Sequence, residues 1–292
     1  MYTLSSDRLR VVVSAPGESP NTTVRFDRTG FIEEVALDGV HRFCASEPHN
    51  LSHISSGGRG ICNEFKAYGD VEAPVGGRFV KPGVGIMHKE HDGPYMFMHK
   101  YKYEPFQIYT EQTANSLLFT TMPEPLNGFA LLHEKRIEVY GNKLTVSSVL
   151  ENVGEKAYIG NEYCHNFLTV NSMSLGPDYL LTFPAGKDRG DEALDGELRA
   201  AGRGFTFTGL PVKARMFSMG ADDFETDRGG ALEWTFINST EGAQVRVCEY
   251  IDLERVTLWA ADHMFSAECF HKISLAPGQS CEWSRSWEFD SI

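Results

Sequence analysis

The segment Glu134–Asn171 reads E-K-R-I-E-V-Y-G-N-K-L-T-V-S-S-V-L-E-N-V-G-E-K-A-Y-I-G-N-E-Y-C-H-N-F-L-T-V-N. Polar and apolar side chains alternate over residues 136–140, and the alternation resumes after a turn at Gly141-Asn142. This period of two predicts two strands of a half-buried antiparallel sheet. A break at Asn152-Val153-Gly154 then precedes a third predicted strand, which carries His165 near its end.

The rest of the chain repeats this pattern of short strands separated by turns. Runs rich in β-branched and aromatic residues predict strands at Leu9–Val13, Thr23–Phe26, Phe31–Leu37, Ser116–Thr121, Leu144–Leu150, Tyr179–Phe183, Leu232–Ile237, Val245–Tyr250, Val256–Ala260 and Ser284–Phe289. Convincing helical periodicity with caps is absent from the sequence. We therefore predict an all-β sandwich or barrel formed by one domain over residues 1–292, with long loops at 46–94 and 187–204.

Composition and charge narrow the possible partners. The chain has 292 residues, of which 41% are apolar, and a formal net charge of -13 with a pI near 5.2. A surface this acidic repels phosphate backbones and anionic lipids, so we expect neither nucleic-acid nor membrane partners. The sequence shows no signal peptide, and its six cysteines are scattered without C-x-x-C spacing. We therefore expect a cytoplasmic protein whose thiols stay reduced. We expect the protein to be a monomer or a homodimer.

Two residues stand out as an acid/base pair. His165 is followed by Asn166 and Phe167, and its imidazole can exchange a proton near neutral pH. Glu268 lies between Ala267 and Cys269, an apolar setting that is unusual for a carboxylate. Each residue alone is more often structural than catalytic. Together they would supply the acid and base that opening of a sugar ring requires.

Several motifs resemble the aldose 1-epimerase (galactose mutarotase-like) family in order and spacing. They are the strand pair of residues 134–150, the Asn152-Val153-Gly154 break, His165-Asn166-Phe167, the strand around Glu268, and Leu275-Ala276-Pro277-Gly278-Gln279 before a final aromatic strand. The N-terminal runs Thr23–Phe26 and Gly30–Val35 resemble the family's opening strands. The resemblance implies an antiparallel β-supersandwich that binds a free sugar, with His165 as general acid and Glu268 as general base. It implies no metal, cofactor or covalent intermediate.

The sugar-binding residues are less clear than the acid/base pair. The family usually carries an Asn-Arg pair in its first half, but here Asn63 is followed by Glu64. The expected substrate-binding residues, which replace or extend the family's set, are Asn63, Glu64, His88, Lys89, Asp223 and Trp259. The family also carries a sugar-binding aspartate after the catalytic histidine, and for this role Asp188 and Asp222 compete with Asp223. This altered set suggests a divergent member acting on a different sugar.

Three alternatives remain open from the sequence. The basic residues Arg59, Lys66, Arg78, Lys81 and Lys89 are compatible with an acidic sugar, and hence with a lyase or isomerase that uses the same pair. A non-catalytic carbohydrate-binding or sensing protein is the second alternative, because a fold does not determine a function. The third is a metal site formed by His49, His53, His88 and His91, which lacks a supporting motif.

Overall fold

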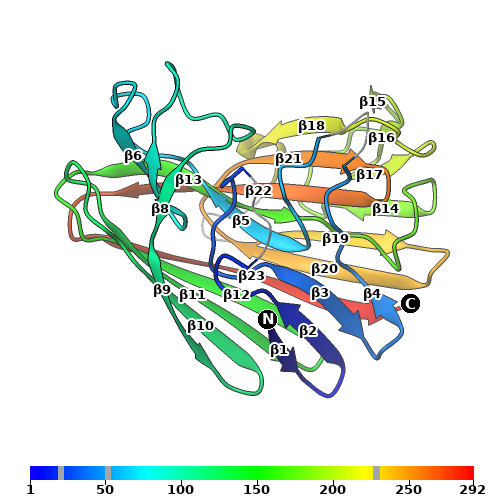
Figure 1. Ribbon diagram of the computed structural model, residues 1–292. Helices are drawn as coiled ribbons and strands as arrows, with labels where there is room; N and C mark the ends of the chain where they lie inside the picture. Colours follow the sequence, from blue (N-terminus) through cyan, green and yellow to red (C-terminus); the bar gives the residue numbers. More distant parts are fainter. Residues whose placement is uncertain (19–22, 50–53, 226–230) are drawn as a thin grey trace.

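The computed structural model describes residues 1–18, 23–49, 54–225 and 231–292, and strands dominate these ranges. All the paired strands are antiparallel (Figure 1). In the described part of the chain, the one helical element is the short 3-10 helix η1 (Ala221–Asp223), and no helix is long and apolar enough to cross a membrane. The predicted all-β class is confirmed.

One sheet has nine strands and carries the candidate catalytic residues. Its order is β1-β2-β3-β5-β13-β22-β21-β18, with β4 paired to β3. The strands are β1 (Tyr2–Ser5), β2 (Leu9–Val13), β3 (Ile32–Leu37), β4 (His41–Arg42), β5 (Ile61–Phe65), β13 (Tyr158–Asn166), β18 (Arg215–Gly220), β21 (Leu253–Ala261) and β22 (Met264–Leu275). Sequence-distant strands β5, β13 and β22 are therefore neighbours in space.

A second sheet has eleven strands, in the order β15-β16-β17-β14-β19-β20-β23-β12-β11-β10-β9. They are β9 (Gln107–Gln112), β10 (Ser116–Met122), β11 (Leu131–Tyr140), β12 (Lys143–Asn152), β14 (Tyr179–Thr182), β15 (Ala193–Asp195), β16 (Leu198–Ala201), β17 (Gly204–Phe207), β19 (Leu232–Asn238), β20 (Ala243–Tyr250) and β23 (Ser280–Ser291). The hairpin predicted around Gly141-Asn142 is β11 and β12, whose register pairs Tyr140 with Lys143.

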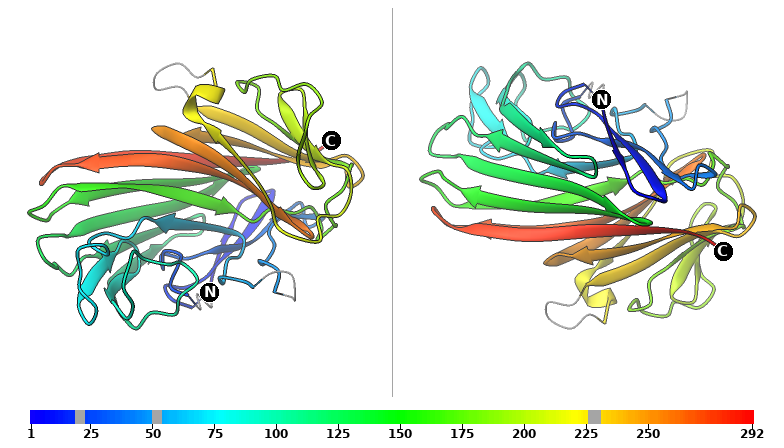
Figure 2. Two further views of the ribbon diagram at one scale, coloured as in Figure 1. Left: turned by 90° about the horizontal axis from the view of Figure 1, so that it is seen from above. Right: turned by 90° about the horizontal axis from the view of Figure 1, so that it is seen from below.

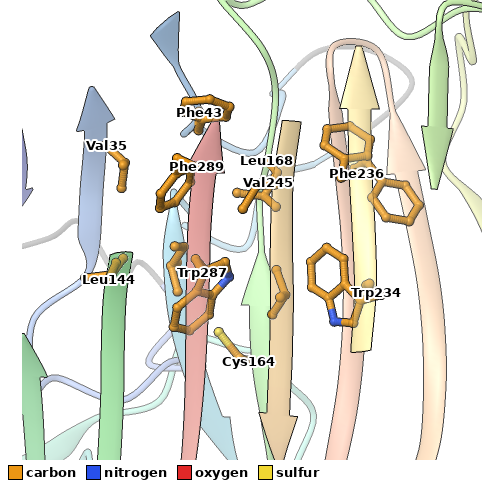
Figure 3. Packing of buried hydrophobic residues seen from close by; sticks show 14 of the residues in the cluster. Val35, Phe43, Leu144, Cys164, Leu168, Trp234, Phe236, Val245, Trp287 and Phe289 are labelled. Carbon is orange, nitrogen blue, oxygen red and sulfur yellow. The ribbon is translucent and has the colours of Figure 1, made fainter. Parts of the chain in front are cut away.

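The main hydrophobic core lies between these two sheets, which form the two layers seen in Figure 2. Figure 3 shows side chains of this core drawn from both layers, among them Cys164 of β13, Trp234 of β19 and Trp287 of β23. All three are completely buried. Period-two alternation sends one face of each strand into this core and the other outward. The outward face of the nine-stranded sheet is thereby available for a site.

The two predicted long loops and one predicted strand need correction. Within residues 46–94 the chain forms β5, β6 (Arg78–Lys81) and β7 (Gly85–His88), and the last two join β8 (Tyr103–Pro105) in a separate three-stranded sheet. Residues 187–204 contain β15 and β16. These strands are only three to five residues long, so their pattern was hidden among glycines and charges. Residues 23–26, by contrast, form no strand.

Candidate active site

Strand register brings the predicted acid and base together. Tyr163 of β13 pairs with Phe270 of β22, so His165, two residues further along β13, faces Glu268, two residues back along β22. Residues at this spacing share one face of a sheet. On the next strand, β21, Thr257 pairs with Glu268 in the same row. The floor of the site is therefore formed by two rows of side chains that run across the strands on the outer face. One row holds Tyr163 and Phe270, and the other holds His165, Glu268 and Thr257.

His165 and Glu268 are in direct contact. The His165 Nδ1 and Glu268 Oε1 atoms lie 2.9 Å apart, and the two side chains are 2% and 9% exposed. The imidazole N–H is not well aligned with the carboxylate, because Nδ1 meets no hydrogen-bond partner of good geometry in the described part of the chain. The pair is thus a close electrostatic contact at the bottom of the site.

The second nitrogen of the imidazole ring, Nε2, contacts a buried guanidinium. Arg25 Nη2 lies 3.2 Å from His165 Nε2, and Glu64 Oε2 lies 3.7 Å from the same nitrogen. When His165 is neutral with its proton on Nδ1, Nε2 accepts a hydrogen bond from Arg25. When His165 is protonated, Glu64 provides a nearby negative charge. Both protonation states therefore have a partner, as an acid/base residue requires.

Arg25 is held in place by a compact network. Its Nε donates to Glu64 Oε2 at 2.6 Å, and its Nη2 donates to the Tyr163 hydroxyl at 3.1 Å. The Tyr163 hydroxyl in turn donates to Glu64 Oε2 at 2.5 Å, and Lys81 Nζ lies 3.1 Å from Glu64 Oε1. Burial alone would raise the pKa of Glu64, but Lys81, Arg25 and His165 outweigh it and hold that pKa well below its usual range. Glu64 is therefore an anion at neutral pH.

The same charges set the pKa of His165. Burial alone would lower the pKa of the imidazole, and Arg25 lowers it further. The adjacent Glu268 carboxylate and, less strongly, Glu64 act in the opposite direction, and the net result is a raised pKa. The protonated form of His165 is therefore favoured relative to a free imidazole, next to the Glu268 carboxylate.

This pair opens into a pocket of about 370 Å³, which is within the range of small-ligand sites. Half of the fourteen lining residues carry polar or charged side chains, and aromatic and methionine side chains form much of the remaining wall. The lining residues are Arg25, Glu47, Ile54, Phe97, Met98, Tyr163, His165, Phe167, Met216, Arg255, Thr257, Trp259, Glu268 and Phe270. A pocket with aromatic faces and a few convergent polar groups suits a monosaccharide.

Two of the six residues expected to bind substrate lie at or beside this pocket. Trp259 lines it, with its ring edge-on to Phe167 at a centroid distance of 5.8 Å. Glu64 lies behind Arg25 and lines an adjoining pocket. Asn63 does not reach either pocket, because successive side chains of β5 point to opposite faces of the sheet. It lies between the sheets instead, donating to Glu162 at 2.5 Å and accepting from Lys135 at 2.8 Å.

The other three expected residues are elsewhere. His88 belongs to the three-stranded sheet, where its Nε2 lies 2.9 Å from Glu104 Oε1. Lys89 is buried, and its ammonium group donates to the Asp70 carbonyl. Asp223 lies in η1 and pairs with Arg189 at 3.0 Å. The sequence placed these residues by their order in the chain, which carries no information on the sheet to which they belong.

The histidines considered for a metal site are also engaged separately. His49 Nδ1 accepts from the Ser55 amide, and His91 Nε2 lies 2.7 Å from the Tyr101 hydroxyl. His53 lies outside the described residues. In the ranges that the structure covers, no group of three or more His, Cys, Asp or Glu side chains is placed to hold a metal ion.

Sequence reasoning missed Arg25, Tyr163 and Arg255. Arg25 was assigned to a strand, although a positive charge between Val24 and Phe26 was a signal that the segment is unusual. Tyr163 is two positions from His165, so it had to share the face of any strand that presents the histidine. The guanidinium of Arg255 packs on the Phe270 ring at 3.6 Å, and nothing local in the sequence announces that contact.

Comparisons with known proteins show which solved structures share this architecture. No family model matches the chain, and no curated protein sequence matches it. Solved structures do match. A galactose mutarotase related enzyme from Lactobacillus acidophilus is 13% identical with a TM-score of 0.59, covering 99% of this chain and 97% of that one. A galactose mutarotase-like protein from Lactobacillus casei is 11% identical with a TM-score of 0.59, covering 99% and 100%.

A more distant source gives the same result. The GalM/aldose epimerase homologue from C. elegans is 9% identical with a TM-score of 0.56, over 99% of this chain and 98% of that one. At identities this low, the structural similarity establishes the fold alone, and the activity has to be argued from the site. The architecture implied by the sequence resemblance is thereby confirmed, and the chain has the galactose mutarotase-like β-sandwich fold.

Proposed function

We propose that this protein is an aldose 1-epimerase, which interconverts the α and β anomers of a free sugar. The observation that carries the proposal is the 2.9 Å contact between His165 and Glu268 at the bottom of a pocket of about 370 Å³. The raised pKa of His165 favours an imidazolium beside a carboxylate. These are the protonation states in which an acid and a base start ring opening.

The proposed reaction needs two proton transfers. Glu268 takes the proton of the anomeric hydroxyl while His165 gives a proton to the ring oxygen, and the C1–O5 bond breaks to leave an open-chain aldehyde. Rotation about C1–C2 presents the other carbonyl face. On closure neutral His165 removes the proton of the C5 hydroxyl, and protonated Glu268 returns its proton to the carbonyl oxygen. Both residues regain their starting states, so the cycle consumes nothing. The sugar has to insert between two groups that touch in its absence.

A neutral sugar fits the charges better than an acidic one. Of the basic residues considered for an acidic sugar, Arg59 pairs with Glu33 at 3.5 Å, Arg78 with Glu104 at 3.4 Å, and Lys81 with Glu64 at 3.1 Å. In the main pocket the cations are Arg25, Arg255 and protonated His165. They are balanced by the carboxylates of Glu47 and Glu268 and by Glu64, which pairs with Arg25 at 2.6 Å. This balance leaves little net attraction for a carboxylate or phosphate.

Anomer exchange measured by NMR tests the proposal, with His165→Asn and Glu268→Gln beside the wild type. We expect acceleration for at least one neutral aldose and its loss in both variants. Binding of a sugar without acceleration would instead support a non-catalytic carbohydrate-binding protein. We further propose that the chain acts as one domain on a free sugar in the cytoplasm, where its six free cysteines would stay reduced.

A further inference from the structure

A second pocket of about 530 Å³ adjoins the first. The two share four lining residues, which are Phe97, Tyr163, Arg255 and Phe270. We propose that this second pocket is a subsite for a further neutral sugar ring, so that the preferred substrate is a reducing disaccharide or a longer saccharide. The proposal rests on the proposed anomer exchange, since that function fixes where the reducing ring lies.

The boundary between the pockets is a stack of flat groups. The Phe270 ring lies parallel to that of Tyr163, with centroids 4.0 Å apart and an interplanar angle of 19°, and the Arg255 guanidinium lies 3.6 Å from the Phe270 centroid. Phe97, which is 45% exposed, also borders both pockets. Tyr163 and Arg255 flank Phe270 on the two neighbouring strands and cover its faces, so this stack forms a rigid ridge between the pockets. The exposed Phe97 ring is the aromatic surface that can contact the C–H face of a sugar ring.

The polar groups of the second pocket favour a neutral, hydroxyl-rich ligand. Its lining holds three carboxylates and three cations, namely Glu64, Asp70, Glu254, Lys66, Lys81 and Arg255. Several are already paired: Lys81 with Glu64 at 3.1 Å, and Arg255 with Glu254. Asn161 adds an amide, whose Nδ2 donates to Glu254 Oε2 at 3.0 Å. Such a mixture offers donors and acceptors without net charge, which matches sugar hydroxyls and not an anion.

The chemistry of the reaction fixes how the saccharide would extend. The reducing ring must place its free anomeric hydroxyl at Glu268 and its ring oxygen at His165, so C1 is not available for a linkage. The second ring is therefore attached through another hydroxyl of the first ring, such as that on C4 or C6. It would pass over the Phe270 stack into the second pocket.

The test compares monosaccharides with matched disaccharides. Anomer exchange is measured for glucose against maltose and isomaltose, and for galactose against β-1,6-galactobiose. The variant is Lys66→Ala combined with Asn161→Ala, because both residues line the second pocket alone. The control is Lys143→Ala, an exposed lysine of β12 in the other sheet. We expect kcat/KM to be higher for a disaccharide than for its monosaccharide, and the double variant to lose about tenfold for the disaccharide only.

Equal kcat/KM values for monosaccharide and disaccharide, or a double variant that affects both alike, would overturn the subsite. If no sugar is exchanged faster than in buffer, the proposed activity fails on its own. The subsite is then judged by isothermal calorimetry on the same sugar pairs. A disaccharide Kd that is lower than the monosaccharide Kd, and that rises about tenfold in the double variant alone, would support it. Equal Kd values would overturn it.

Discussion

His165 of β13 and Glu268 of β22 face each other across neighbouring antiparallel strands, with Nδ1 and Oε1 2.9 Å apart. They are far apart in the chain, and only the sheet register joins them. Arg25 contacts the opposite nitrogen of the imidazole at 3.2 Å. Burial and Arg25 therefore lower the pKa of His165, whereas Glu268 raises it and outweighs them.

Glu268→Gln should lower the pKa of His165. The substitution removes the carboxylate that raises this pKa and leaves burial and Arg25, both of which lower it. We expect the NMR titration midpoint of the His165 ring to lie above the ordinary value of about 6.5 in the wild type. In the variant it should fall below the wild-type midpoint. An unchanged midpoint would mean that the carboxylate does not govern the imidazole.

Activity should decline as the pH rises through the raised pKa of His165, because the neutral imidazole lacks the proton for the ring oxygen. The basic limb of kcat/KM against pH is therefore expected above about 6.5. A basic limb below the ordinary histidine pKa would contradict this assignment.

The contribution of His165 to the free energy of unfolding should also fall as the pH rises. A pKa raised by folding contributes stability that is fully present below the unfolded pKa and is lost as the pH rises through the folded one.

Glu64→Gln should destabilise the protein strongly. It removes the buried carboxylate that contacts both Arg25 and Lys81, and breaking such a pair typically costs about 3–5 kcal/mol in the free energy of unfolding. Urea denaturation measures the loss. Glu34→Gln is the matched control, because Glu34 also pairs with two cations, Arg10 and Arg42, whose side chains are both exposed; it should cost at most about 1 kcal/mol.

The same carboxylate predicts how stability depends on acid. The pKa of Glu64 is lowered by folding, so its contribution is present above the unfolded pKa and is lost as the pH falls through the folded pKa. The stability difference between wild type and Glu64→Gln should therefore shrink as the pH falls below the ordinary glutamate pKa of about 4.3. A difference that stays constant with pH would show that Glu64 is not stabilising as an anion.

Asn63→Ala separates a structural role from a binding role. Asn63 bridges Lys135 and Glu162 between the sheets, and its loss leaves both short of a buried partner. We expect a loss of about 1–3 kcal/mol in the free energy of unfolding. The KM for the sugar should not change, because the side chain lies outside the pocket. A raised KM with unchanged stability would restore the substrate-binding role that the sequence suggested.

How much the sequence could predict depended on the range of the interactions involved. Alternation in residues 136–140 identified the β11–β12 hairpin, since period and turn are local properties. The pairing of His165 with Glu268 came from family resemblance, because register between distant strands is not written in either strand. Arg25 was missed for a related reason. It reaches the site from a segment without regular structure, where no periodicity indicates the direction of a side chain.

The most direct test of the account is the rate of anomer exchange for neutral aldoses, measured by NMR in the wild type, His165→Asn and Glu268→Gln. Urea denaturation of each variant confirms that it is folded. The account predicts acceleration by the wild type and a loss of about 100-fold or more in each folded variant. Full activity in either folded variant would contradict the assignment of His165 and Glu268 as the acid and base.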